Sequence, residues 1–191
     1  LRSVSFSGYN LTTIEGGAFS GCNALETMTL SPSIKEVSSY LFYGCANLKT
    51  VLFDVYPDDY VDETKRGTSD LSGVGSKAFY GCTSLQAVCY KNDFSNFQND
   101  ASAGAVALPA TIKTIGANAF ENSNLTSIEF KTYADGANAG KSGLEKIGDY
   151  AFASTPITKF VFPESANADG IAIGDFIFRS CYKLTSVTYS N

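Results

Sequence analysis

Histidine and tryptophan are absent from this chain of 191 residues, and methionine occurs once. Without histidine, the side chain that most often serves as a general base and that completes serine and cysteine catalytic triads is missing. Zinc is also disfavoured, because the five cysteines include no Cys-x-x-Cys pair. We therefore expect a protein that is not an enzyme and that has no catalytic residue, no metal and no cofactor.

Long apolar runs and positive charge are also scarce. No hydrophobic stretch approaches the roughly 18 residues of a membrane span, so we expect no membrane insertion by this segment. The net charge of -5 argues against nucleic acid, which needs a basic stripe on the protein. A hydrophobic content of 44% in a chain of this length is enough to bury a sizeable core.

What the chain does have is one phrase that recurs six times. Each copy contains a phenylalanine, usually preceded by alanine, with isoleucine or valine five residues earlier and leucine or isoleucine five or six residues later. The anchor phenylalanines are Phe19, Phe42, Phe79, Phe120, Phe152 and Phe178. Repetition of this kind is the sequence mark of a solenoid, in which each coil is one repeat.

Each copy ends in a segment that alternates apolar and mostly polar residues, such as residues 25–30 and 125–130. This alternation, rich in β-branched and aromatic residues, predicts a short half-buried strand. One such strand cannot hide its apolar side alone, so consecutive copies should stack in parallel around one core. The Ala-Phe-x-Gly-Cys piece predicts a tight helical or 3-10 turn whose phenylalanine points inward.

The full phrase, I-x-x-I-G-x-x-A-F-x-x-C-x-x-L-x-x-V-x-L, is most complete in residues 74–90, 112–130 and 144–162. It resembles the BspA-like leucine-rich repeats of bacterial and protist surface proteins, and the resemblance covers the whole chain. It implies an α/β solenoid, a right-handed superhelix of six to seven coils that forms a single domain over residues 1–191. Because residues 1–6 match only the strand of a seventh copy, we expect this domain to be a region of a longer protein.

The same resemblance implies a function at the cell surface or in the extracellular space of a bacterium. We expect a secreted or surface-bound module that mediates protein binding or adhesion to host or neighbouring cells. A glycan-binding module that uses aromatic loops is the alternative.

Four cysteines share one position, three residues after their anchor: Cys22, Cys45, Cys82 and Cys181. Such a position suits a small buried side chain, so free buried thiols are expected, although a disulfide between neighbouring coils stays open. Cys89 is the one thiol outside this column, at an outward strand position. It is the only plausible nucleophile, but the sequence supplies no base, and we expect a partly exposed cysteine.

The outward strand positions are rich in serine and threonine and carry few charges. Glu129 and Lys159 are two of these charges. The concave sheet is the usual binding surface of repeat proteins, so this face is a candidate for recognition. Alternatively, serine and threonine are simply tolerated in a crowded parallel ladder.

Insertions lengthen the distance between anchors from 23 residues in the first interval to 37, 41, 32 and 26 in the next four. The extra residues, roughly 54–70, 91–107, 131–143 and 163–170, all follow the sheet strand, so they should project from one edge of the stack. Aromatic residues in these loops make this edge the predicted partner-binding site, unless they pack against their own coil. The predicted site residues are Tyr56, Tyr60, Phe94, Phe97 and Tyr133 from the loops, with Glu129 and Lys159 from the sheet.

The first insertion is also acidic, with six carboxylates between residues 54 and 70. Clustered carboxylates can bind calcium, but the twelve-residue calcium-loop pattern is absent. We favour a solvated acidic loop, and calcium binding remains the alternative.

Overall fold

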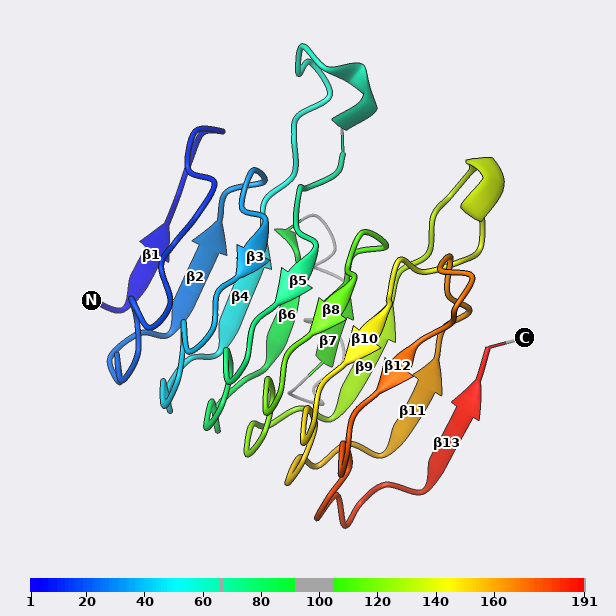
Figure 1. Ribbon diagram of the computed structural model, residues 1–191. Helices are drawn as coiled ribbons and strands as arrows, with labels where there is room; N and C mark the ends of the chain where they lie inside the picture. Colours follow the sequence, from blue (N-terminus) through cyan, green and yellow to red (C-terminus); the bar gives the residue numbers. More distant parts are fainter. Residues whose placement is uncertain (66, 92–104, 191) are drawn as a thin grey trace.

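Parallel strands stack side by side into an elongated body, with the two chain ends at opposite ends of the stack (Figure 1). The computed structural model describes residues 1–65, 67–91 and 105–190. The long sheet contains β1 (Ser3–Ser5), β2 (Thr27–Leu30), β4 (Thr50–Phe53), β6 (Ala87–Tyr90), β7 (Ala105–Leu108) and β9 (Ser127–Phe130), in that spatial order. Two further strands, β11 (Lys159–Phe162) and β13 (Ser186–Tyr189), pair with each other. The predicted solenoid of stacked parallel strands is confirmed.

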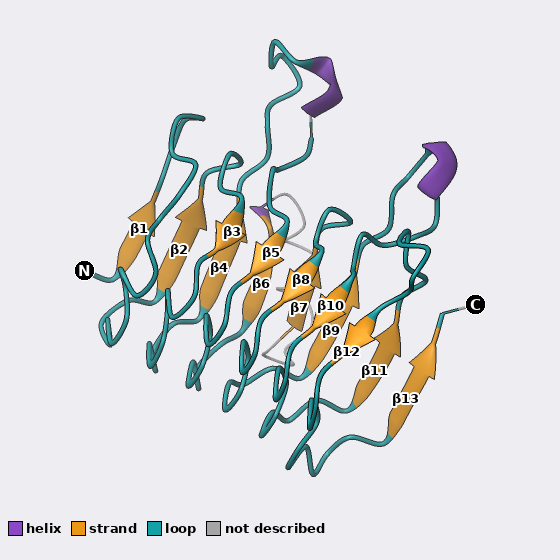
Figure 2. Cartoon of the chain, in the orientation of Figure 1, coloured by secondary structure: helices purple, strands orange, loops and turns teal. Residues whose placement is uncertain are grey.

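A second sheet of two-residue strands runs along the other side of the coils (Figure 2). Its strands are β3 (Glu36–Val37), β5 (Gly73–Val74), β8 (Thr114–Ile115), β10 (Lys146–Ile147) and β12 (Ala172–Ile173). Each ends on the aliphatic residue that precedes an anchor phenylalanine by five positions. In several coils glycine follows this aliphatic residue, because the backbone of the preceding coil is very close at that point. A Cβ on Gly116 would collide with the backbone nitrogen of Ser76.

The segment around each anchor is a run of tight turns and not a helical turn, which corrects that part of the prediction. In the Phe120 coil, Asn118 and Asn122 both have positive φ, at 57° and 55°. A residue in the left-handed region cannot continue a right-handed helix, so these two positions break the helical path on either side of the anchor. The 3-10 helices η1 (Glu63–Lys65) and η3 (Gly136–Asn138) lie in the insertions instead.

These turns add a third row of hydrogen bonds between coils. The amide of Phe120 donates to the Ala151 carbonyl at 2.8 Å, and the amide of Phe79 donates to the Ala119 carbonyl at 2.8 Å. Neighbouring coils are therefore joined along the long sheet, along the second sheet and along the turn edge. This arrangement satisfies backbone groups that a buried turn would otherwise leave unpaired.

The anchor phenylalanines point inward, as predicted, and their rings form one continuous stack through the core. Phe120 is fully buried, and its ring centroid lies 5.0 Å from that of Phe79 and 6.0 Å from that of Phe152, with interplanar angles of 6° and 18°. The stack ends at Phe178, whose ring is only partly buried. Stacked rings in a dry core contribute both buried area and favourable ring contacts.

The cysteine column lies beside this stack and holds free thiols. Cys45 donates from Sγ to the Phe19 carbonyl at 2.9 Å, and Cys82 donates to the Phe42 carbonyl at 3.3 Å. Burial is the main cause that raises the pKa of both thiols, so neither is primed to act as a nucleophile. Ser123 occupies the equivalent position in the Phe120 coil, and its buried Oγ has no hydrogen-bond partner.

One strand of the long sheet was not predicted. β7 begins within the second insertion, which we expected to be a projecting loop, and it pairs with both β6 and β9. Val106 and Leu108 face the core and are buried, like the inward residues of the regular copies. The insertion therefore adds a rung to the sheet, and only its described residues 91 and 105–107 can be placed.

The long sheet is interrupted between β9 and β11, although the second sheet continues across that junction. After other strands the next residue donates its amide to the preceding coil, as Lys131 does to the Leu108 carbonyl at 2.9 Å. The corresponding residue after β11 is Pro163, which has no N–H to donate. Phe160 adds to the separation because its ring fills an inward position that is aliphatic or methionine in the other long-sheet strands.

Candidate functional site

Two insertions project from the same edge of the stack, as predicted (Figure 1). Each begins with a tyrosine whose backbone closes the loop by two hydrogen bonds. Tyr56 donates its amide to Thr68 and accepts from Gly67, at 2.9 and 2.8 Å; Tyr133 donates to Lys141 and accepts from Gly140, both at 2.9 Å. We call the enclosed segments, residues 57–66 and 134–139, the clasped loops.

Tyr56 is a structural residue of the first clasped loop. Its side chain is 2% exposed, and its ring is stacked on Tyr9, with the centroids 5.6 Å apart. The hydroxyl group of Tyr56 donates to Asp70 at 2.8 Å, and the ammonium group of Lys65 lies 3.0 Å from the same carboxylate. Tyr56 therefore cannot contact a partner, and its prediction as a binding residue is wrong. Its ring packs against its own loop, which is the alternative stated for these aromatic residues.

Burial is the main cause that raises the pKa of Tyr56 to about 12, and the hydrogen bond to Asp70 adds to it. The same carboxylate raises the pKa of Lys65 through its hydrogen bond. Both groups therefore stay protonated at neutral pH, and together with Asp70 they form a local network that holds the loop.

Three acidic residues of the first insertion each interact with a different partner. Asp70 pairs with Lys65, Asp54 lies 3.5 Å from the ammonium group of Lys91, and Asp62 accepts from the Thr64 hydroxyl at 2.6 Å. Within the described part of the chain, no three cysteine or carboxylate side chains are grouped so that they could hold a metal ion. The described geometry gives no support to the calcium alternative.

The stacked coils, the cysteine column and the two sheets together reproduce one known repeat. The BspA type leucine rich repeat region matches in six copies, over residues 1–99, 63–168 and 93–191. The chain belongs to the BspA-type leucine-rich repeat family. Proteins of this family are typically not enzymes, and leucine-rich repeat domains of this kind generally bind proteins. No curated protein matches the chain at a significant level.

Solved structures with this fold include bacterial surface proteins. A leucine rich cell surface protein from Faecalibacterium prausnitzii superposes with a TM-score of 0.58 at 16% identity, over 99% of this chain and 48% of that one. The pneumococcal vaccine antigen PcpA superposes with a TM-score of 0.56 at 23% identity, over 87% of this chain and 31% of that one. This BspA-type chain thus spans about half or less of the length of either protein.

The outward face of the BspA-type sheet is open only in part. At its centre Thr50, Ala87, Cys89 and Ala107 are between 0% and 7% exposed. Cys89, for which we expected partial exposure, is fully buried in an apolar cluster with Ala87, Ala107 and Leu52. A thiol in this position is not accessible to a substrate.

The two charged sheet residues of the prediction are accessible. The Glu129 side chain is 60% exposed and lies 3.3 Å from the ammonium group of Lys131. Lys159 is also exposed, but it belongs to β11, across the interruption of the sheet. The face is therefore accessible toward the C-terminal coils and, through the exposed Ser3, Ser5 and Thr27, at the N-terminal end, but not at its centre.

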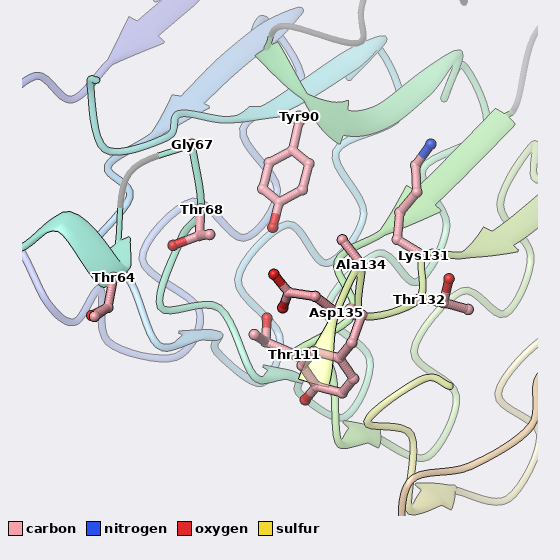
Figure 3. Close-up of a pocket in the computed structure, with 11 residues that line it drawn as sticks. Thr64, Gly67, Thr68, Tyr90, Thr111, Lys131, Thr132, Ala134 and Asp135 are labelled. Carbon is pink, nitrogen blue, oxygen red and sulfur yellow. The ribbon is translucent and has the colours of Figure 1, made fainter. Parts of the chain in front are cut away.

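A cavity of about 590 Å³ lies between the two clasped loops (Figure 3). Its wall comes from the first loop and the residues after it, from Tyr90 at the end of β6, from residues 110 and 111, and from residues 131–135. Tyr133 lines it, so this predicted residue is at a concave site. The hydroxyl group of Tyr133 lies over Gly143, where even a Cβ would come within 2.9 Å of it, so the ring is held in place by close packing.

The sequence predicted the positions of the loops but not which residues come together around the cavity. Tyr90 stands at an inward strand position, which indicates only a core residue, and it does pack against the core with partial burial; Asp135 has no sequence signal at all. Phe94 and Phe97 lie outside the described residues. Tyr60 is half-buried, with its ring edge-on to Tyr9 at 5.0 Å and 4.5 Å from the ring of Tyr56.

None of the helices in the described residues has the length and apolar character that a bilayer crossing requires.

Proposed function

We propose that this chain is the non-enzymatic recognition module of a cell-surface or secreted bacterial protein, and that it binds a protein on host or neighbouring cells. The observation that carries this proposal is the edge with two clasped loops. Both loops are closed at their base by backbone hydrogen bonds and present their tips away from the stack. Loops held on a rigid scaffold are the usual place for binding residues.

The proposed footprint combines the loop tips with the accessible part of the sheet. Tyr9, which is 41% exposed, and Tyr60 provide aromatic surface at the first loop. Glu129 and Lys159 provide charge at the rim, where charges tune specificity and the association rate more than affinity. Tyr56 supports this footprint from below because it holds both tyrosine rings in place.

The test measures binding of the fluorescently labelled chain to epithelial and bacterial cells by flow cytometry. We expect saturable binding that is lost after mild protease treatment of the cells. The Tyr60→Ala variant should weaken it at least 10-fold, which corresponds to about 1.4 kcal/mol for an aromatic contact residue. Tyr182→Ala is the matched control, because Tyr182 is 92% exposed and lies at the turn edge, away from the loops.

A second variant tests the loop as a whole. Replacing residues 57–66 by a two-residue turn keeps Tyr56 and Gly67, which close the loop, and should abolish binding while preserving the melting temperature within a few degrees. Binding that persists at full strength in this variant would exclude the first loop from the site. Absence of protease-sensitive binding to every cell type would overturn the proposal of a protein ligand.

A glycan ligand is the second candidate, and the cavity beside Tyr133 is the observation that favours it. An aromatic ring next to hydroxyl and carboxylate groups in a concave site suits a small polar ligand better than a flat protein surface does.

A further inference from the structure

The cavity between the clasped loops is built from parts of the chain that are far apart in sequence. Thr68 follows the first loop, Thr111 belongs to the segment after β7, and Asp135 opens the second loop. In Figure 3 the hydroxyl group of Tyr90 and the carboxylate of Asp135 both point into the space between the loops. A volume of about 590 Å³ lies within the range of small-ligand sites, about 300 to 1,000 Å³.

Three polar residues of the wall offer hydrogen-bond acceptors to a ligand. Thr68 donates its hydroxyl proton to the Lys65 carbonyl at 2.7 Å, and Thr111 donates to the Leu71 carbonyl at 2.5 Å. Each hydroxyl oxygen therefore offers only lone pairs to a ligand. Asp135 adds a carboxylate that does not cap the 3-10 helix after it, although it stands at the N-cap position.

Charge restricts the ligand further. Among the described residues of the wall the one cation is Lys131, which lies 3.3 Å from Glu129 and points away from Asp135 (Figure 3). Asp135 is exposed and lines the cavity, and no cation among the described residues forms an ion pair with its carboxylate. Phosphorylated or carboxylated ligands would meet repulsion there, whereas neutral ligands rich in O–H donors would meet acceptors.

Another part of the wall is apolar. Tyr133 contributes a ring that packing against Gly143 holds in place, and Ala110 and Ala134 contribute methyl groups. A neutral sugar ring matches this combination, because it has an apolar C–H face that can lie on an aromatic ring and adjacent hydroxyl groups at its edge.

We propose that this cavity binds a neutral saccharide with two adjacent free hydroxyl groups. Asp135 accepts hydrogen bonds from the two hydroxyls, Tyr133 stacks on the C–H face, and Thr68 and Thr111 accept from further hydroxyls. This proposal rests on the glycan-binding function given above as the second candidate and specifies the ligand class. It does not require that the loops also bind a protein.

The experiment is ligand-observed saturation-transfer NMR with the purified chain and methyl glycosides of glucose, galactose, mannose, N-acetylglucosamine and glucuronic acid. We expect at least one neutral glycoside to bind with a Kd of about 1 mM or tighter, which corresponds to about -4 kcal/mol, and the glucuronide not to bind. The Asp135→Asn variant should weaken binding at least 10-fold, and Tyr133→Leu should do the same by removing the ring.

Asp58→Asn is the matched control, because Asp58 is an exposed carboxylate in the other clasped loop and does not line the cavity. A thermal melt checks that each variant is folded; Tyr90→Phe, which keeps its ring, replaces Tyr133→Leu if the latter unfolds. Absence of saturation transfer from every neutral glycoside overturns the proposal, and so does binding that Asp135→Asn leaves unchanged. If a neutral glycoside binds but the chain shows no protease-sensitive binding to cells, only the proposed protein-binding function is refuted.

Discussion

Truncation of one anchor phenylalanine in the middle of the stack tests the idea that the core is a linear array. Phe120→Ala removes a fully buried ring that is stacked on both sides, on Phe79 and on Phe152. Loss of the buried ring and the cavity left behind cost about 3 to 5 kcal/mol in other cores. The two lost ring contacts, about 0.5 to 1.5 kcal/mol each, place this site at the upper end, near 5 kcal/mol.

The same change at the end of the array should be much milder. Phe178 is only partly buried and is stacked on one anchor, Phe152, at 5.9 Å. We expect Phe178→Ala to lower the free energy of unfolding by about 2 kcal/mol, because it disturbs one interface between coils and leaves less of a cavity.

Urea unfolding followed by far-UV circular dichroism measures both values. Since a loss near 5 kcal/mol is a large part of the stability of an ordinary domain, Phe120→Leu provides a folded variant with the same ranking at about 1 to 2 kcal/mol. Equal losses for the middle and end positions would refute the argument, because they would mean that stability does not depend on the number of stacked neighbours.

Three further outcomes follow from buried polar groups. Ser123→Ala should raise the free energy of unfolding by about 1 kcal/mol in the same urea assay, because it removes a buried hydroxyl without a partner; a loss of stability would contradict this. Stability should fall by roughly 1 to 3 kcal/mol as the pH rises from about 10 to about 12, because Tyr56 loses its proton at lower pH when unfolded than when folded; Tyr56→Phe should remove this dependence. Cys45, Cys82 and Cys89 should react with a thiol reagent only after unfolding, and peptide mapping that finds a label on Cys89 of the native protein would show that the sheet face is open.

The repeat phrase was sufficient to predict the fold, because each column of the phrase corresponds to one structural position. Ile115 falls in the second sheet, Phe120 in the stack and Ile128 on the inner side of the long sheet. This register follows from periodicity alone, since every copy repeats the same side-chain directions.

The extra strand β7 was missed for a physical reason. Ala105–Leu108 is apolar throughout, without the alternation of the regular strands, and it has neither an anchor phenylalanine nor a leucine three residues ahead of its first inward position, so it does not match the phrase. Cys89 was predicted to be partly exposed because its strand position faces outward, but the register of a strand does not reveal what lies over that face. Burial of the outer side is a tertiary effect that no local pattern records.

The candidate site shows the same limit. The position of Tyr133 in an insertion could be predicted from repeat spacing, but its proximity to Thr68 depends on how two loops more than 60 residues apart in sequence are closed. Asp135 is unremarkable in sequence, because its importance comes only from the cavity that it faces.

The interruption between β9 and β11 has a mechanical consequence. With the chain ends at opposite ends of the stack, a pulling force acts across the coil junctions in series, and each junction carries the whole load. Most junctions share that load among three rows of hydrogen bonds, but the junction after β9 lacks the row of the long sheet. Pro163 and Phe160 therefore weaken this junction against tension, and the second clasped loop lies in the very segment that connects β9 to β10, so a force on the chain would act directly on that loop.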